Sequence, residues 1–146
     1  MSVDVVAEQH IARAPGDVAA FAMDPANDLR WIKALSGVRK LTEGPVGPGT
    51  RIERVATFLG RRIEYVNEIT ALEPGRRLEM RSVKAPFPMR VTYEFEPAGD
   101  GALARIRASG DTGRFYALAG PLLGRMVRRG ISRDLGALKA ELERDR

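Results

Sequence analysis

The chain has 146 residues, of which 44% are hydrophobic and 29% are charged, proportions typical of one globular domain and not of a disordered or membrane-spanning chain. It contains no cysteine and a single histidine, which excludes disulfides, cysteine nucleophiles, cysteine-ligated metals and histidine-rich metal sites. Its 24 Lys and Arg residues outnumber 19 Asp and Glu residues, but the two signs are interleaved along the chain, so we expect no nucleic-acid partner.

Alternation of apolar and polar residues is the strongest pattern in the sequence. Successive side chains of a strand point to opposite faces, so a strand with one buried face must alternate in this way. In 62–69, for example, the odd positions are expected to face inward and Val66 outward. The pattern predicts an antiparallel meander of about seven strands, in chain order 3–11, 38–42, 51–58, 62–69, 77–82, 89–96 and 102–108.

Helical periodicity appears in three places. Two short helices are predicted after the first strand, one opening at 15–17 and the other following Asp24-Pro25. The longest helix is predicted to begin at Tyr116 or Pro121 and to end at Glu143, with an apolar stripe at Leu123, Val127, Ile131, Leu135, Leu138 and Leu142. Burying that stripe predicts an α+β fold, in which the sheet curls around the C-terminal helix.

The chain shows no sign of a membrane segment or of a second domain. No stretch approaches the roughly 20 consecutive apolar residues that span a bilayer. The start, Met1-Ser2-Val3-Asp4, lacks the basic and apolar regions of a signal peptide. We therefore expect a single domain over residues 1–146, located in the cytoplasm, without an integral membrane segment.

Several segments of this predicted scaffold carry a family resemblance, at residues 11–15, 24–27, 44–51, 68–69, 72–78 and 134–143. With them, the chain over essentially its whole length resembles the SRPBCC superfamily, also called the START-like or helix-grip group, and within it the polyketide cyclase/dehydrase-like branch. The resemblance implies a deep apolar cavity between helix and sheet. Relatives use such a cavity to bind or transport lipids, sterols, polyketides, quinones or hormones, or to catalyse cyclisation or dehydration. These motifs are scaffold positions, so no active site is carried over.

Candidate ligand-binding residues are those expected to face the space between sheet and helix. Glycine inside a helix costs about 1 kcal/mol relative to alanine, and Gly120 and Gly124 fall on the same side of the helix as Val127 and Ile131. Close packing of helix on sheet is the alternative interpretation of these glycines, as core packing is for Trp31. The candidate set is Trp31, Arg54, Phe58, Tyr65, Asn67, Met80, Met89, Tyr93, Gly120, Gly124, Val127 and Ile131.

Asp134 is the unusual residue of the last helix, because it lies near the middle of the apolar stripe. A buried carboxylate is costly unless it is paired, and Arg54 is the candidate partner. The pair is interpreted either as a structural ion pair or as a group that orients a ligand or exchanges protons with it. In the second interpretation the candidate catalytic residues are Asp134, Arg54, Tyr65 and Tyr93.

The leading hypothesis is binding, with transport as an extension, of a small hydrophobic molecule such as a lipid, polyketide or quinone, with no metal and no cofactor. The second is a cyclase or dehydratase that uses the same cavity without metal. The third is an interaction module that docks through the basic C-terminal helix, which carries Arg125, Arg128, Arg129 and Arg133. Peripheral contact with a membrane stays open, and so does the choice between monomer and homodimer.

Overall fold

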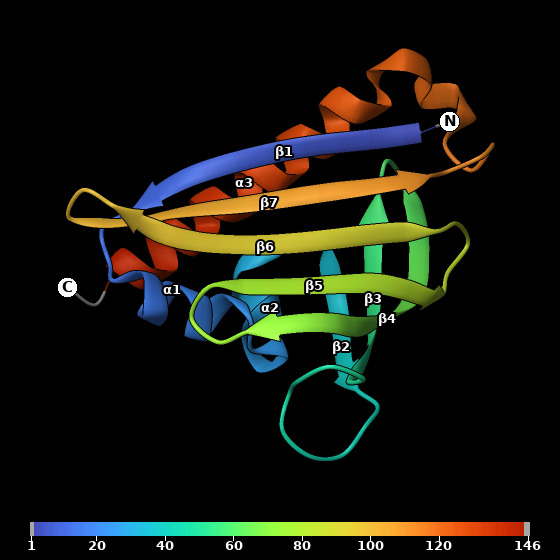
Figure 1. Cartoon of the computed structure of the whole chain (residues 1–146). Coiled ribbons are helices and arrows are strands. Elements are labelled where there is room, and N and C mark those ends of the chain that lie inside the picture. Colours follow the sequence, from blue (N-terminus) through green and yellow to red (C-terminus); the bar gives the residue numbers. More distant parts are fainter. Residues whose placement is uncertain (1, 145–146) are drawn as a thin grey trace.

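An antiparallel sheet curls around the C-terminal helix (Figure 1). The computed structural model describes residues 2–144, except the side chain of residue 118. The strands lie in the order β1-β7-β6-β5-β4-β3-β2. They are β1 (Ser2–Ile11), β2 (Leu35–Lys40), β3 (Arg51–Phe58), β4 (Arg61–Glu73), β5 (Arg77–Lys84), β6 (Met89–Ala98) and β7 (Gly101–Asp111). The predicted helix-grip architecture is confirmed.

Strand β4 departs from strict alternation. Its pairing with β5 shifts register between Val66 and Asn67, and again between Ile69 and Ala71. At the first shift the extra residue is Val83 of β5, and at the second it is Thr70 of β4. Such an extra residue disturbs the alternation of its strand and bends it. Val66 and Asn67 are both buried, but in the unbroken pairing with β3 Val66 lies opposite Glu53 and Asn67 opposite Ile52, so Val66 keeps the predicted outward side of the sheet. Figure 1 shows that β4 changes direction along its length, which helps the sheet to curl.

The two predicted short helices after β1 are present. They are α1 (Pro15–Ala22) and α2 (Asp28–Trp31), and a 3-10 turn, η1 (Pro25–Asn27), runs into α2. Proline suits the first position of α1, because its missing N–H would have no partner within the helix. At η1 the Asp24 carboxylate accepts a hydrogen bond from the Ala26 N–H at 3.0 Å, which fixes the entry of this segment.

The C-terminal helix α3 (Leu123–Glu143) begins later than predicted. The expected start at Tyr116 or Pro121 falls before and within a 3-10 segment, η2 (Ala117–Leu122), in which Gly120 has φ 56° and ψ −142°. Residues with a side chain rarely adopt this positive φ. Gly120 therefore allows the backbone to leave the helical conformation at this point, and the regular helix α3 begins after it.

Packing differs between the two halves of α3. Leu135, Leu138 and Leu142 belong to the main core, together with residues that include Ile11, Val18, Ala19, Trp31 and Phe95. Leu123, near the start of α3, belongs to a smaller cluster with Val3, Ile63 and Tyr116. The space that could receive a ligand lies at this second cluster.

Candidate functional site

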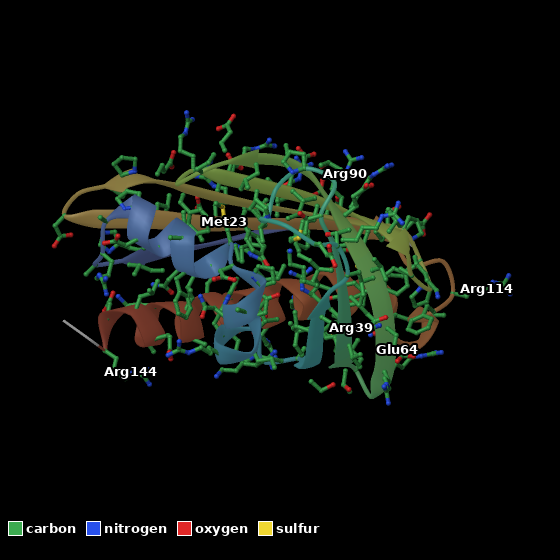
Figure 2. The ribbon with its side chains drawn as sticks, turned by 90° about the horizontal axis from the view of Figure 1, so that it is seen from below. Met23, Arg39, Glu64, Arg90, Arg114 and Arg144 are labelled. Carbon is green, nitrogen blue, oxygen red and sulfur yellow. The ribbon has the colours of Figure 1, made fainter. Side chains whose placement is uncertain are left out.

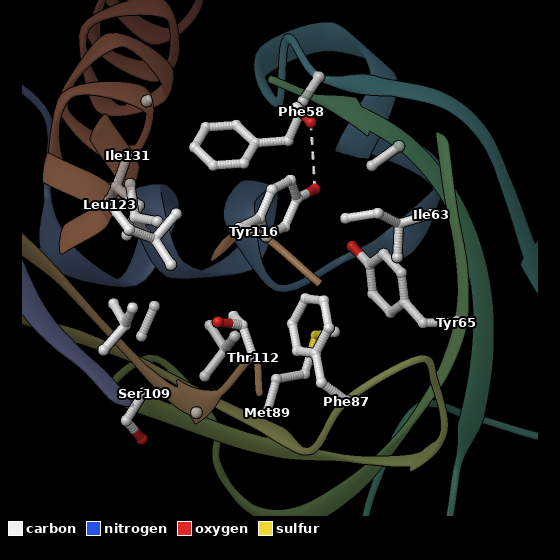
Figure 3. Close-up of a pocket in the computed structure, with 18 of the residues that line it drawn as sticks. Phe58, Ile63, Tyr65, Phe87, Met89, Ser109, Thr112, Tyr116, Leu123 and Ile131 are labelled. Atoms are coloured by element: carbon white, nitrogen blue, oxygen red, sulfur yellow. Dashed lines mark hydrogen bonds between the residues drawn. The ribbon is translucent and has the colours of Figure 1, made fainter. Parts of the chain in front are cut away.

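A pocket of about 240 Å³ lies between the N-terminal half of α3 and the inner face of the sheet (Figure 3). Its lining is mostly apolar and includes Phe58, Ile63, Phe87, Met89 and Leu123. The pocket is partly open to solvent. Moving apolar surface from water into such a space contributes roughly 25 cal/mol per Å² of buried area, so the pocket favours an apolar occupant.

An aromatic wall holds one side of this pocket in place. The Tyr116 ring packs edge-on against Phe58, with ring centroids 5.5 Å apart, and lies 6.0 Å from the Phe87 ring. The Tyr116 hydroxyl donates a hydrogen bond to the Phe58 carbonyl oxygen at 3.1 Å. The Arg61 guanidinium lies 3.9 Å from the centroid of the Phe115 ring. It also donates a hydrogen bond to the backbone carbonyl oxygen of Phe115, at 2.8 Å. These contacts join the β3–β4 turn to the segment before α3.

Tyr65 supplies a polar group to the pocket. Its ring belongs to the lining, and Figure 3 shows its hydroxyl directed into the space. Within residues 2–144, no hydrogen bond is formed by this hydroxyl. Burial raises the pKa of Tyr65, while the nearby Arg54 charge opposes that rise. The group is therefore a neutral phenol that can donate a hydrogen bond and also accept one.

Asp134 also lines the pocket, but it has a different partner from the one predicted. One of its carboxylate oxygens accepts a hydrogen bond from the Lys33 backbone N–H at 3.0 Å and lies 3.5 Å from the Arg133 guanidinium. Its side chain is 14% exposed. Burial raises the pKa of Asp134, and the Lys33 N–H and Arg133 oppose that rise. Asp134 thus ties α3 to the chain that follows α2.

The predicted pairing of Arg54 with Asp134 is wrong, because Arg54 pairs with Asp28. The Arg54 Nε and Nη2 atoms lie 2.9 and 2.8 Å from the same Asp28 oxygen, and the two side chains are only 5% and 2% exposed. A third guanidinium nitrogen lies 3.6 Å from the Met80 sulfur. Two ionic side chains therefore satisfy each other inside the core.

Burial and the charge of the partner shift the pKa of each group of this pair in opposite directions. Burial lowers the pKa of Arg54, but the Asp28 carboxylate, with smaller contributions from Tyr93 and Tyr65, raises it on balance. Burial raises the pKa of Asp28, and the Arg54 charge opposes that rise. The short charge-assisted hydrogen bonds favour the ionised form of both groups.

Sequence reasoning missed Asp28 because an acidic residue at the start of a helix is ordinary. The available signal was its spacing from Trp31, which is 1% exposed. Residues three apart on a helix share a face. A helix that buries Trp31 therefore turns Asp28 toward the core, where a cation must meet it.

The structure brings part of the predicted ligand-binding set to the pocket. The lining contains Phe58, Tyr65, Met89, Val127 and Ile131. Other members lie outside the lining, buried in the core: Trp31, Arg54, Asn67, Met80 and Tyr93. Trp31 packs edge-on against Tyr93, with ring centroids 5.7 Å apart, in agreement with the core-packing interpretation.

The glycines of α3 have separate roles. Gly120 and Gly124 are absent from the lining, and a Cβ added at Gly124 would lie 3.8 Å from the Val5 side chain of β1. That is ordinary contact distance, so Gly124 faces β1 and a methyl group would fit there. Gly130 does line the pocket, and a Cβ there would lie 3.9 Å from the Phe58 ring. Lining residues that the sequence did not single out include Val3, Ile63, Phe87, Thr112, Tyr116 and Leu123.

Other kinds of site find less support in the structure. Within residues 2–144, no three His, Asp or Glu side chains gather as a metal site would require. In the same part of the chain, no helix is long and apolar enough to cross a membrane. Arg125, Arg128 and Arg129 are exposed on α3, and no acidic partner is found for them among the described residues.

A family model described as polyketide cyclase/dehydrase and lipid transport matches residues 2–143. The chain belongs to this family. The resemblance drawn from the scaffold segments is thereby confirmed. No curated protein matches the sequence. The family description covers both enzymes and lipid carriers. Family membership therefore does not distinguish catalysis from binding, and support for either comes from the residues of the pocket.

Solved structures share the fold of this family member. TTHA0849 from Thermus thermophilus has a TM-score of 0.84 at 20% identity, with 97% of this chain and 98% of that chain covered. A START superfamily protein from Mycobacterium smegmatis has a TM-score of 0.83 at 12% identity, covering 98% and 99%. The Zhui aromatase/cyclase from Streptomyces sp. R1128 has a TM-score of 0.79 at 17% identity, covering 99% and 95%. At these identities the likeness is one of fold.

Proposed function

We propose that this protein binds a small, mostly apolar molecule that carries at least one hydroxyl or carbonyl group. The observation that carries the proposal is the Tyr65 hydroxyl, which faces an otherwise largely apolar pocket and has no hydrogen-bond partner among the described residues. A ligand that displaces water from the pocket leaves this hydroxyl without a partner, at a cost in free energy, unless the ligand itself carries a polar group. A ligand with one matching polar group avoids that cost. The family description, which includes cyclisation and lipid transport, is compatible with such a ligand.

The volume of the pocket limits the size of the ligand. An apolar cavity of about 150 Å³ accommodates benzene, and pockets for drug-sized ligands begin at about 300 Å³. The 240 Å³ of this pocket lies between the two values. It therefore suits a molecule of one or two rings, such as a quinone or a short aromatic polyketide, better than a whole long-chain lipid.

Tyr65→Phe tests the hydrogen bond directly. The wild-type protein should bind one molecule of 2-naphthol and should prefer it to naphthalene, which has the same skeleton without the hydroxyl. A neutral hydrogen bond contributes about 0.5 to 1.5 kcal/mol, so the preference lost in Tyr65→Phe should be about two- to twelvefold in affinity. Fluorescence titration of both compounds measures it.

Tyr116→Phe is the matched control, because the Tyr116 hydroxyl already donates to the Phe58 carbonyl oxygen. This variant should lose some stability and keep the preference for 2-naphthol. If neither compound binds to the wild-type protein, the proposed function is wrong. If both bind and Tyr65→Phe keeps the preference, Tyr65 is not the polar contact.

Asp134 supports a second candidate function, proton exchange in a cyclase or dehydratase reaction. Its carboxyl group lines the pocket, and burial raises its pKa above 3.8. A raised pKa makes the protonated form of the carboxyl group more accessible, and that form can protonate a bound carbonyl or a leaving hydroxyl group. Dehydration needs a proton donor of this kind, and Tyr65 would then orient the substrate.

The pH dependence of stability tests whether Asp134 is as buried as this role requires. Its folded-state pKa is raised, so its contribution to stability is present below pH 3.8 and is lost as the pH rises through the folded-state pKa. Asp134→Asn stays neutral and should therefore gain stability relative to the wild-type protein as the pH rises above 3.8 and through the folded-state pKa of Asp134. Urea unfolding at a series of pH values measures the difference. A difference that does not change with pH would show that the carboxyl group is well solvated.

The other expectations stay proposals. They are transport of the ligand, a cytoplasmic location, one domain over residues 1–146, and docking through the basic face of α3. Arg125, Arg128 and Arg129 are exposed, as docking requires. A solvated helix face has the same appearance, so ligand binding is the better supported function.

A further inference from the structure

The outer face of the sheet carries a second hollow, of about 180 Å³, on strands β5, β6 and β7. It is lined by Arg77, Glu79, Arg90, Thr92, Arg107 and Ser109. Figure 2 shows Arg90 on the side of the sheet away from α3. Arg90 and Ser109 also border the ligand pocket, since the sheet is a single layer there, but the Ser109 hydroxyl points away from that pocket (Figure 3).

The charges around this hollow are unbalanced. Three guanidinium groups meet one carboxylate, that of Glu79, which lies 3.3 Å from Arg77. Arg107 donates two hydrogen bonds to Asp4, at 2.9 and 2.7 Å. Among the described residues, no acidic partner is found for Arg90. The hollow therefore keeps one guanidinium group available to a ligand.

The register of the sheet makes the position of Arg90 unfavourable without an anion. Arg90 lies directly opposite Arg81 on β5 and opposite Ser109 on β7. Like charges at directly opposed positions of an antiparallel pair destabilise the sheet. The Arg81 guanidinium lies 3.6 Å from a Glu68 carboxylate oxygen. That carboxylate balances the charge of Arg81, and the charge of Arg90 stays without a counterion among the described residues of the sheet. An anion bound beside Arg90 would relieve the repulsion between the two arginines.

Two hydroxyl groups complete a set of hydrogen-bond donors in the hollow. Thr92 lies next to Arg90 on the same face of β6 and is only 9% exposed, yet its hydroxyl makes no hydrogen bond to any described residue. The Ser109 hydroxyl likewise has no partner in the described chain. A guanidinium group and two hydroxyls can all donate to oxygen atoms of one anion.

We propose that this hollow is a binding site for a phosphate or sulfate group, with Arg90 supplying the charge and Thr92 and Ser109 supplying hydrogen bonds. The ligand is the free anion or a monoester of a small molecule. Because Arg90 is exposed, screening limits the interaction, and we expect dissociation constants in the millimolar range that rise with ionic strength. The site is separate from the proposed function of the inner pocket and does not depend on it.

Phosphate titration at constant ionic strength, with chloride as the balancing anion, tests the site. Backbone and arginine Nε–H resonances from ¹⁵N-labelled protein should shift at β5, β6 and β7, and sulfate should compete. Arg90→Gln should weaken phosphate binding at least tenfold. Arg125→Gln is the control and should leave phosphate binding unchanged. It removes the same charge from an exposed arginine of α3 that has no acidic partner among the described residues.

Methyl phosphate in place of inorganic phosphate tests the monoester, and tighter binding of methyl phosphate would identify it as the preferred ligand.

Two results would overturn the proposal. One is equal weakening in Arg90→Gln and Arg125→Gln, which indicates a general effect of net charge. The other is a set of resonance shifts spread over the basic face of α3.

Without phosphate, Arg90→Gln should melt at the same temperature as the wild-type protein or slightly above it, because the repulsion from Arg81 is gone. Thr92→Val, which keeps every charge, should also weaken phosphate binding and guards against an effect of Arg90→Gln on the fold.

Discussion

Asp28→Asn should lower the free energy of unfolding by about 3 to 5 kcal/mol, the usual cost of removing one partner of a buried ion pair. The substitution keeps the shape of the side chain but leaves the Arg54 guanidinium without a countercharge. Arg54 is 5% exposed and cannot recover its hydration without opening the core. A domain of this size has only about 5 to 15 kcal/mol of stability, so the loss should be evident in urea or thermal unfolding.

Removing both charges should reverse much of that loss. In the double variant with Asp28→Leu and Arg54→Met, neither group is left buried and unpaired, and such replacements are often neutral or stabilising. Asp134→Asn serves as the control, since Asp134 does not contact Arg54 and bonds to the Lys33 N–H instead. If Asp28→Asn proves no more harmful than Asp134→Asn, the buried pair is not a main stabilising feature.

Gly130→Leu should abolish most ligand binding, with affinity for 2-naphthol reduced tenfold or more, equivalent to about 1.4 kcal/mol. A Cβ at Gly130 would already lie 3.9 Å from the Phe58 ring, at ordinary contact distance. The remaining carbon atoms of leucine must then occupy the pocket. Leucine also favours helix over glycine by up to about 1 kcal/mol, which helps the variant to remain folded.

Gly136→Leu is the matched control for this experiment. Gly136 lies in the same helix, and a Cβ there would have no atom within 4 Å. The same gain in helix propensity is expected, without any effect on the pocket. Circular dichroism establishes that both variants fold, and fluorescence titration compares their affinities. Unchanged 2-naphthol binding in a folded Gly130→Leu variant would place the ligand elsewhere.

The sequence alone was sufficient for the architecture. Period-two alternation follows from the geometry of a strand, and the 3.6-residue periodicity follows from the geometry of a helix. Both patterns can therefore be recognised from residues that are close together in the sequence. They predicted the strands, the two short helices and the stripe of leucines on α3. The register shifts between β4 and β5 and the break at Gly120 were missed, because each is a local departure whose backbone conformation depends on the neighbouring segments.

The site needed the tertiary structure. Which acid pairs with Arg54 depends on distances between segments far apart in the chain, and the sequence pattern favoured Asp134 although Asp28 lies within 2.8 Å. Which glycine opens the pocket depends on how α3 is rotated against the sheet. Gly124 and Gly130 are about 240° apart around a helix of 3.6 residues per turn. The periodicity of the helix therefore determined that one face is buried, whereas the packing of that face against β1 and β3 decided which of its positions contact the sheet and which contact the ligand pocket.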